Sequence, residues 1–198
     1  GRAELARACA VLATSYGLTD EDEAIRWGTR AIALADQAGC ADALIYTLNT
    51  VGTIEFRRGD PDGQAKLERS IELAAAAGDE IGVARAHLHL ALVPVTLRDW
   101  ALADQQLALA KAYCAGRELE SWVLWLTAMQ AESELARSHW ARAEEMAASV
   151  LAALPDRPDH IRAVALTVLA RTRARRGDDG YWAPLDEAAE VVRSMTLP

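Results

Sequence analysis

Short polar breaks recur along this chain at an almost constant interval, and this regularity constrains the fold more than any other feature of the sequence. Aligning one residue from each break gives spacings of 40, 39, 40 and 39; the aligned residues are Thr19, Gly59, Arg98, Ser138 and Gly177. A second series of breaks falls between them, at 37–40, 76–80, 114–118 and 154–159. A fixed period of this length indicates a repeat architecture, and two breaks per period predict two helices per repeat.

The segments between the breaks are predicted to be helices, because they are rich in Ala and Leu and show no sustained period-2 alternation. The expected helices span 2–16, 21–37, 41–58, 62–77, 80–97, 100–115, 118–137, 140–153, 159–176 and 182–195. Residues that favour helix ends lie at their boundaries. The expected N-caps are Asp20, Asp79 and Asp99, and the expected left-handed residues after helices are Gly39, Gly78 and Gly116.

The second helix of a repeat carries a stripe of mostly small residues. In the helix over 100–115 the stripe is Ala103, Leu107, Ala110 and Cys114, with spacings of 4, 3 and 4 residues. This spacing follows one face of a helix, so the stripe is predicted to pack in the core. The helix over 140–153 repeats the start of the series with Ala143, Ala147 and Val150.

This pattern resembles the tetratricopeptide repeat, which has a small residue midway along helix A, an aromatic residue after the turn, and small residues in helix B. The matching residues are Leu12, Gly52, Ala91, Ala131 and Ala170 in helix A, Trp100 and Trp140 after the turn, and Ala24, Ala31, Ala103, Ala110, Ala143 and Val150 in helix B. Gln64 and Trp182 stand at the first helix-B position of repeats two and five, where the apolar phase slips by one. The resemblance implies an all-α, right-handed α-solenoid of about five tetratricopeptide-like hairpins, with about ten helices and helix A lining the concave side.

Two longer stretches, 46–79 and 161–191, resemble the helical-repeat region of large bacterial LuxR-type transcriptional regulators. In that family a P-loop ATPase module precedes the repeats and a helix-turn-helix follows them. This sequence contains no GxxxxGK[ST] phosphate loop and no separate helix-turn-helix, so ATP and DNA binding are not transferred to any of its residues. The resemblance implies a cytoplasmic sensor or interaction domain of such a regulator. The alternative is a freestanding protein–protein interaction scaffold.

The expected organisation is a single helical-repeat domain over residues 1–198, cut from a longer protein. Its repeats are predicted at 1–39, 40–78, 79–116, 117–155 and 156–198. No apolar stretch is long enough to span a membrane. The net charge of −8 disfavours contact with nucleic acid phosphates.

The sequence contains no pattern typical of a catalytic or metal site. Cys9, Cys40 and Cys114 form no CxxC motif and are interpreted as buried, reduced thiols. His87 and His89 are two residues apart, which places them about 200° apart on a helix, too far round to share a metal. No Ser, Thr or Cys lies in a recognisable nucleophile motif. We therefore expect no enzyme activity, no cofactor and no metal.

A ligand- or partner-binding groove is predicted from the resemblance, by transferring the helix-A positions that line tetratricopeptide grooves. The groove set is Tyr46, Asn49, Thr53 and Arg57 in repeat two; Arg85, Leu88, His89 and Leu92 in repeat three; Trp125, Met129 and Glu132 in repeat four; and Thr167, Arg171 and Arg175 in repeat five. An apolar middle with polar and cationic ends suits a peptide or a small-molecule effector, or a neighbouring segment of the parent protein. Its anionic part would face Arg85, or Arg171 and Arg175.

Two parts of this set have a simpler structural interpretation. Arg171 and Arg175 lie one turn apart and could form a solvated face with salt bridges instead of an anion site. Trp122 and Trp125 could fill space between repeats instead of lining the groove. Both alternatives stay open at the level of sequence.

Overall fold

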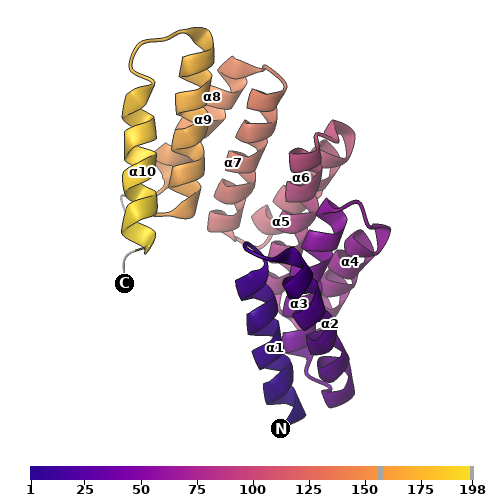
Figure 1. Ribbon diagram of the computed structural model, residues 1–198. Helices are drawn as coiled ribbons and strands as arrows, with labels where there is room; N and C mark the ends of the chain where they lie inside the picture. Colours follow the sequence, from indigo (N-terminus) through magenta and orange to yellow (C-terminus); the bar gives the residue numbers. More distant parts are fainter. Residues whose placement is uncertain (156–157, 197–198) are drawn as a thin grey trace. The chain divides into compact units, whose positions relative to one another are not determined.

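The chain folds entirely into helices and turns over residues 1–155 and 158–196, which are the residues that this computed structural model describes. Within this range there are ten helices (Figure 1): α1 Arg2–Tyr16, α2 Glu21–Ala38, α3 Ala41–Arg57, α4 Pro61–Ala76, α5 Glu80–Leu97, α6 Trp100–Ala115, α7 Glu120–Ala136, α8 Trp140–Ala153, α9 His160–Arg176 and α10 Trp182–Thr196. They form successive hairpins, which confirms the all-α, tetratricopeptide-like repeat fold. Residues 156–157, within the predicted break at 154–159 and at the start of the predicted fifth repeat, lie outside the described residues.

The helices group into two compact units, unit 1 over 1–110 and unit 2 over 111–198. In unit 1, α1 and α3 each pack against the helix that follows and also against the next odd-numbered helix, so that α3 contacts α1, α2, α4 and α5. In unit 2, α7 likewise contacts both α8 and α9. We call the odd-numbered helices A helices and the even-numbered helices B helices. Whether all five repeats act as one domain stays a prediction.

In repeat two the A helix is buried much more deeply than the B helix. Ten of the seventeen residues of α3 are buried, whereas α4 buries four of its sixteen. A stripe of buried positions in the B helices follows the prediction, with spacings of 4, 3 and 4 residues in α2, α4 and α6 and of 4 and 3 residues in α8 and α10. They are Ala24, Gly28, Ala31 and Ala35 in α2; Gly63, Leu67, Ser70 and Ala74 in α4; Ala103, Leu107, Ala110 and Cys114 in α6; Ala143, Ala147 and Val150 in α8; and Pro184, Ala188 and Val191 in α10.

Two helix backbones of unit 1 approach closely where α3 crosses α4. A Cβ atom added to Gly63 would lie 2.1 Å from the Phe56 backbone nitrogen and 2.7 Å from the Gly52 carbonyl oxygen. A Cβ atom on Gly52 would lie 2.8 Å from the Gly63 carbonyl oxygen. Two backbones can approach this closely because neither glycine has a side chain. Gly63, and not Gln64, is therefore the first helix-B position of repeat two.

Two further positions in the predicted repeat alignment are wrong, by one residue in α1 and by two residues in α10. Leu12 is 37% exposed, and the buried small residue of α1 is its neighbour Ala13. Trp182 is 58% exposed, and Pro184 begins the buried stripe of α10. The distance from the small residue in helix A to the first buried residue in helix B is 11 residues in repeats one and two, 12 in repeats three and four, and 14 in repeat five.

The ends of the helices use the predicted caps, with one exception. Asp20, Asp79 and Asp99 each accept a hydrogen bond from a backbone N–H in the first turn of the following helix. Gly39 and Gly78 are left-handed, as predicted. Gly116 is not, because the left-handed residue of the α6–α7 turn is Glu118, with φ of 58°.

Burial of the cysteines agrees with the sequence analysis. Cys9, Cys40 and Cys114 are all buried and unpaired. Over the described residues, no helix combines the length and the apolar character that crossing a bilayer requires.

Candidate functional site

The A helices of unit 1 place equivalent side chains side by side at an interval of 39 residues. The first row of such residues is Arg7, Tyr46 and Arg85, from α1, α3 and α5. One turn further along the helices, the second row is Val11, Thr50 and His89, and the third is Thr14, Thr53 and Leu92. We call these nine residues the A-helix face of unit 1. Hydrogen bonds between Thr14 and Thr50 and between Thr53 and His89 join the second row to the third.

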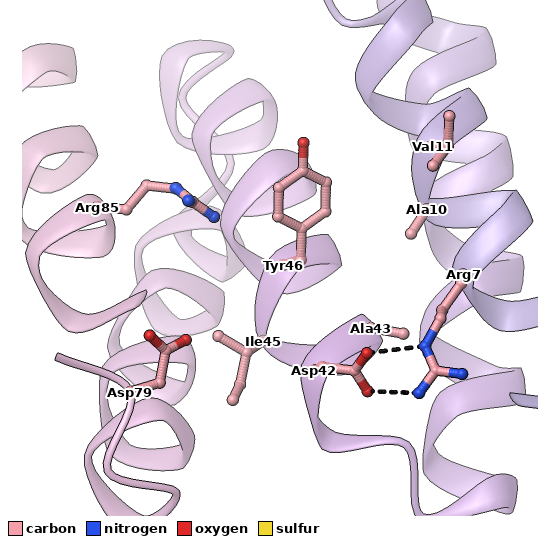
Figure 2. Close-up of a pocket in the computed structure, with 9 residues that line it drawn as sticks. All are labelled: Arg7, Ala10, Val11, Asp42, Ala43, Ile45, Tyr46, Asp79 and Arg85. Atoms are coloured by element: carbon pink, nitrogen blue, oxygen red, sulfur yellow. Dashed lines mark hydrogen bonds and ion pairs between the residues drawn. The ribbon is translucent and has the colours of Figure 1, made fainter. Parts of the chain in front are cut away.

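A cavity of about 390 Å³ opens at the first row (Figure 2). Its lining comes from α1, α3, α5 and the turn before α5; the lining residues are Arg7, Ala10, Val11, Asp42, Ala43, Ile45, Tyr46, Asp79 and Arg85. The ring of Tyr46 stands between the arginine of α1 and the arginine of α5. The cavity therefore combines an aromatic and aliphatic wall with charges of both signs, which is the character of a ligand site.

Arg7 is neutralised within the cavity by Asp42. Its Nε and Nη2 atoms donate hydrogen bonds of 2.8 and 3.2 Å to the two carboxylate oxygens of Asp42. The thiol of Cys40 also donates to Asp42. The hydrogen bonds from Arg7 and Cys40 hold the pKa of Asp42 well below its usual range. This pair has little charge left to offer a ligand.

Arg85 is the cation that remains available in the cavity. Its guanidinium carbon lies 5.3 Å from the centre of the Tyr46 ring, within range of a cation–π interaction. Among the described residues, no carboxylate forms an ion pair with Arg85. A half-buried guanidinium held against an aromatic ring loses little freedom on binding, so it is prepared to accept an anion.

Hydroxyl groups and an imidazole continue the A-helix face beyond the cavity. The hydroxyls of Thr14 and Thr50 are 3.3 Å apart, which joins α1 to α3. The hydroxyl of Thr53 is hydrogen-bonded to Nδ1 of His89, which joins α3 to α5. Burial, with a smaller contribution from the charge of Arg85, lowers the pKa of His89 to about 4. His89 is therefore neutral near pH 7 and has one nitrogen committed to Thr53.

Asn49 lies beside this face on α3 and carries an unsatisfied donor. Its side chain is 2% exposed, and its Nδ2 atom has no hydrogen-bond partner within the described part of the chain. A buried amide without a partner costs free energy, so an acceptor from a water molecule or a ligand would stabilise it.

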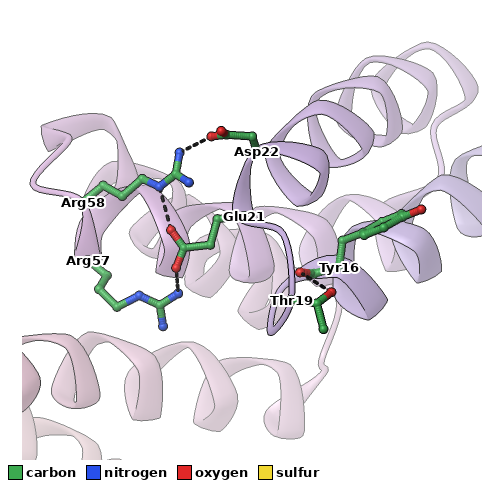
Figure 3. Close-up of polar contacts among 6 residues, drawn as sticks. All are labelled: Tyr16, Thr19, Glu21, Asp22, Arg57 and Arg58. Carbon is green, nitrogen blue, oxygen red and sulfur yellow. Dashed lines mark hydrogen bonds and ion pairs between the residues drawn. The ribbon is translucent and has the colours of Figure 1, made fainter.

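An ion-pair network lies at the end of the A-helix face that is farthest from the cavity (Figure 3). Glu21, at the start of α2, binds Arg57 and accepts a 2.7 Å hydrogen bond from Nε of Arg58. Arg58 also donates to Asp22, at 2.7 Å. The hydrogen bond from Arg58 is the largest cause that lowers the pKa of Glu21. Arg57, predicted to line the groove, is thus engaged with Glu21.

The predicted groove residues of unit 2 are mostly engaged inside that unit. Trp125 packs against the core cluster of α7, α8 and α9, and its ring centre lies 6.0 Å from that of His160. Met129 is buried. Glu132 lies 3.6 Å from Arg171, and burial raises the pKa of Glu132. Arg175 donates a 2.9 Å hydrogen bond to the backbone carbonyl of Leu135.

Several other predicted residues serve their own helices or the core. Thr167 donates its hydroxyl proton to the backbone carbonyl of Ala163, at 2.8 Å. Leu88 is buried, and Leu92 is partly exposed in the third row. A single groove through repeats two to five stays a prediction, since Arg85 belongs to unit 1 and Trp125 to unit 2.

The sequence analysis missed Arg7, Asp42 and Asp79, which line the cavity with Tyr46 and Arg85. Arg7 had a detectable signal, because it precedes Tyr46 by the same 39 residues that separate Tyr46 from Arg85. Asp79 was recognised as a helix cap, and nothing in its local sequence indicates a second role. Across the described residues, His, Cys, Asp and Glu side chains nowhere gather in a group of three or more that could hold a metal ion.

Comparison with known proteins supports the fold alone. No protein-family model and no curated protein sequence matches the chain. Among solved structures, the chain is similar to the crystal structure of BtubC (BKLC) from P. vanneervenii, with a TM-score of 0.69 and 19% sequence identity. The match covers 98% of this chain and 82% of that one. At this identity the similarity shows that the two chains share a fold and carries no residue roles.

Proposed function

We propose that this chain is a helical-repeat interaction scaffold, not an enzyme, and that it binds its partner on the A-helix face of unit 1. The division of labour between the two kinds of helix supports this proposal. The B helices bury a stripe of small residues, as packing requires. The A helices of unit 1 present Arg, Tyr, Thr and His side chains in rows at a constant interval. Such rows give an extended partner regularly spaced contacts.

The observation that carries the proposal is Arg85, a cation without an ion-pair partner among the described residues, held against Tyr46 in a cavity. An unpaired, half-buried guanidinium contributes little to the stability of the fold, so a role in binding is a better explanation for Arg85. A partner with an anionic group would complete its hydrogen bonds, and the neighbouring aliphatic residues Val11 and Ile45 would supply apolar contact area.

Both a peptide segment and a small-molecule effector have this chemistry. The setting of a LuxR-type regulator, implied by the sequence resemblance, stays the second candidate. Neither the cavity nor the comparisons favour that setting over a freestanding scaffold, so the scaffold is our main proposal.

Selection from a displayed library of random peptides tests the proposal. We expect enriched sequences to carry Asp or Glu beside an apolar residue. Their synthetic versions should bind the parent protein and lose about tenfold or more in affinity with Arg85→Gln or Tyr46→Ala, since a charge-assisted hydrogen bond contributes on that scale. Arg69→Gln is the matched control, because Arg69 lies on the surface of α4 and pairs with Asp36.

The proposal fails if no peptide family is enriched, or if the enriched peptides bind the Arg85 and Tyr46 variants as tightly as the parent. A submicromolar affinity for duplex DNA at physiological salt would also contradict it, because the net charge of −8 opposes phosphate binding.

A further inference from the structure

The cavity at the first row contains a second charge that is not paired, and its sign is opposite to that of Arg85. Asp79 lines the same cavity as Arg85. No lysine or arginine among the described residues forms an ion pair with it, and Arg85 itself does not. Arg7 and Asp42, the other two charges of the cavity, neutralise each other through two hydrogen bonds. The cavity thus presents one available cation and one available anion.

Asp79 is held in place by its role in the backbone. Its Oδ1 atom accepts a 2.8 Å hydrogen bond from the Gly82 N–H, which caps the first turn of α5. The N-cap uses one carboxylate oxygen, and the other, Oδ2, lies against the backbone of Gly82. In Figure 2 the carboxylate of Asp79 and the guanidinium of Arg85 lie on the same side of the cavity, both supported by α5. Asp79 caps α5 and Arg85 lies on α5, so both charges are held by the start of one helix.

Apolar groups form the rest of the lining. Ile45 and Tyr46 come from α3, and Ala10 and Val11 come from α1. Val11 is 61% exposed, so packing of the core does not require an apolar residue at this position. The cavity volume of about 390 Å³ lies within the range of small-molecule sites.

We propose that this cavity binds a zwitterionic small molecule, an α-amino acid with an apolar side chain. The ligand carboxylate forms hydrogen bonds with Arg85, the ligand ammonium group forms an ion pair with the free oxygen of Asp79, and the ligand side chain packs against Tyr46, Ile45 and Val11. This inference rests on the proposed function, because it assigns a ligand class to the same face. A peptide segment with an acidic and a basic side chain could present the same two charges, so the experiment has to separate these two sources.

Isothermal titration calorimetry on the full chain provides the test, with L-phenylalanine and L-leucine as probes. Two analogues each lack one charge: 3-phenylpropionate has no ammonium group, and phenethylamine has no carboxylate. We expect both amino acids to bind, and both analogues to bind about tenfold more weakly or worse, because each leaves one charge of the cavity without a partner.

The variants Arg85→Gln and Asp79→Asn should reduce amino acid affinity by about tenfold or more. Asparagine caps a helix as well as aspartate does, so Asp79→Asn removes the charge and keeps the cap. The matched control is Asp20→Asn, which makes the same change at the cap of α2, outside the cavity. It should leave the affinity unchanged.

The inference is overturned if neither amino acid binds, if 3-phenylpropionate binds as well as L-phenylalanine, or if Asp79→Asn has no more effect than Asp20→Asn. It is also overturned if an acetylated, amidated peptide with Glu and Lys side chains binds through Arg85 and Asp79 while free amino acids do not. That last outcome, like Arg85-dependent peptides from the displayed library, would leave the proposed scaffold function intact. If neither amino acids nor peptides bind in a way that depends on Arg85, both proposals are overturned.

Discussion

Replacing Gly63 with alanine tests the close contact between α3 and α4. The new Cβ atom would meet three backbone atoms: the Phe56 nitrogen at 2.1 Å, and the Glu55 carbonyl carbon and Gly52 carbonyl oxygen at 2.7 Å. None of them can rotate away as a flexible side chain could, so the helices must separate by more than about 1 Å to restore van der Waals distances. The substitution therefore disturbs the packing of the whole hairpin.

The expected free-energy change has two parts of opposite sign. Overpacking a core costs typically about 1 to 3 kcal/mol, and three backbone contacts place this site near the upper end. Alanine gains about 1 kcal/mol over glycine inside a helix. The net destabilisation is therefore about 2 kcal/mol. For a chain of this length that lowers the melting temperature by about 4 to 8 °C.

Thermal unfolding followed by circular dichroism measures this shift. Gly116→Ala is the control, because its Cβ would meet its nearest neighbour, the Ala112 carbonyl oxygen, at 3.5 Å, an ordinary contact. If the two units unfold in separate transitions, the shift belongs to the transition of unit 1. A melting temperature of Gly63→Ala equal to or above that of the parent would refute the close approach and the register assigned to repeat two.

Three further predictions follow from the packing and the titrating groups. Ala91→Leu and Ala131→Leu should each destabilise the protein by about 1 to 3 kcal/mol, because both alanines are fully buried; unchanged melts would refute the repeat alignment. His89 has a pKa of about 4 in the folded protein, below the ordinary histidine value of 6.5, so the unfolded chain binds a proton first as pH falls. Stability should therefore decline between about pH 6.5 and 4, by at most about 1.4 kcal/mol per pH unit. Urea titrations over this range should show a smaller decline for His89→Gln. Asp42 has a lowered pKa, so its contribution is present above about pH 4 and is lost as pH falls further; because Arg7 and Asp42 are more than half exposed, Asp42→Asn should remove only a small part of the acid sensitivity.

Most of the fold could be predicted because its signals are local. The helix boundaries follow from caps such as Asp20 and from breaks between amphipathic segments, and they differ from the observed ends by two residues at most. The errors concern close packing. Gln64 was assigned a core position that Gly63 occupies, because the distance between two backbones at a crossing is not encoded in the periodicity of either helix.

The candidate site could be predicted only in part, because its composition depends on neighbours far apart in the sequence. Tyr46 and Arg85 were identified through the repeat pattern, and both line the cavity. The pairing of Arg7 with Asp42, which decides that Arg85 is the available cation, joins α1 to α3 across 35 residues and has no local signal. Arg175 is a second example: its sequence context left open a solvated face with salt bridges or an anion site, and its observed partner is a backbone carbonyl of another helix.

The difference in residue number between the small position of helix A and the first buried position of helix B rises from 11 to 14 along the chain, while the 4, 3 stripe inside each B helix is unchanged. The repeats therefore differ in length at the turn between helix A and helix B, and the buried face of each helix keeps its spacing. A deletion inside α4 or α6 would rotate every later residue of that helix by about 100° and misplace its stripe. Insertions between hairpin helices should be tolerated in evolution and in engineering, which gives this architecture a defined set of sites where loops or tags can be grafted.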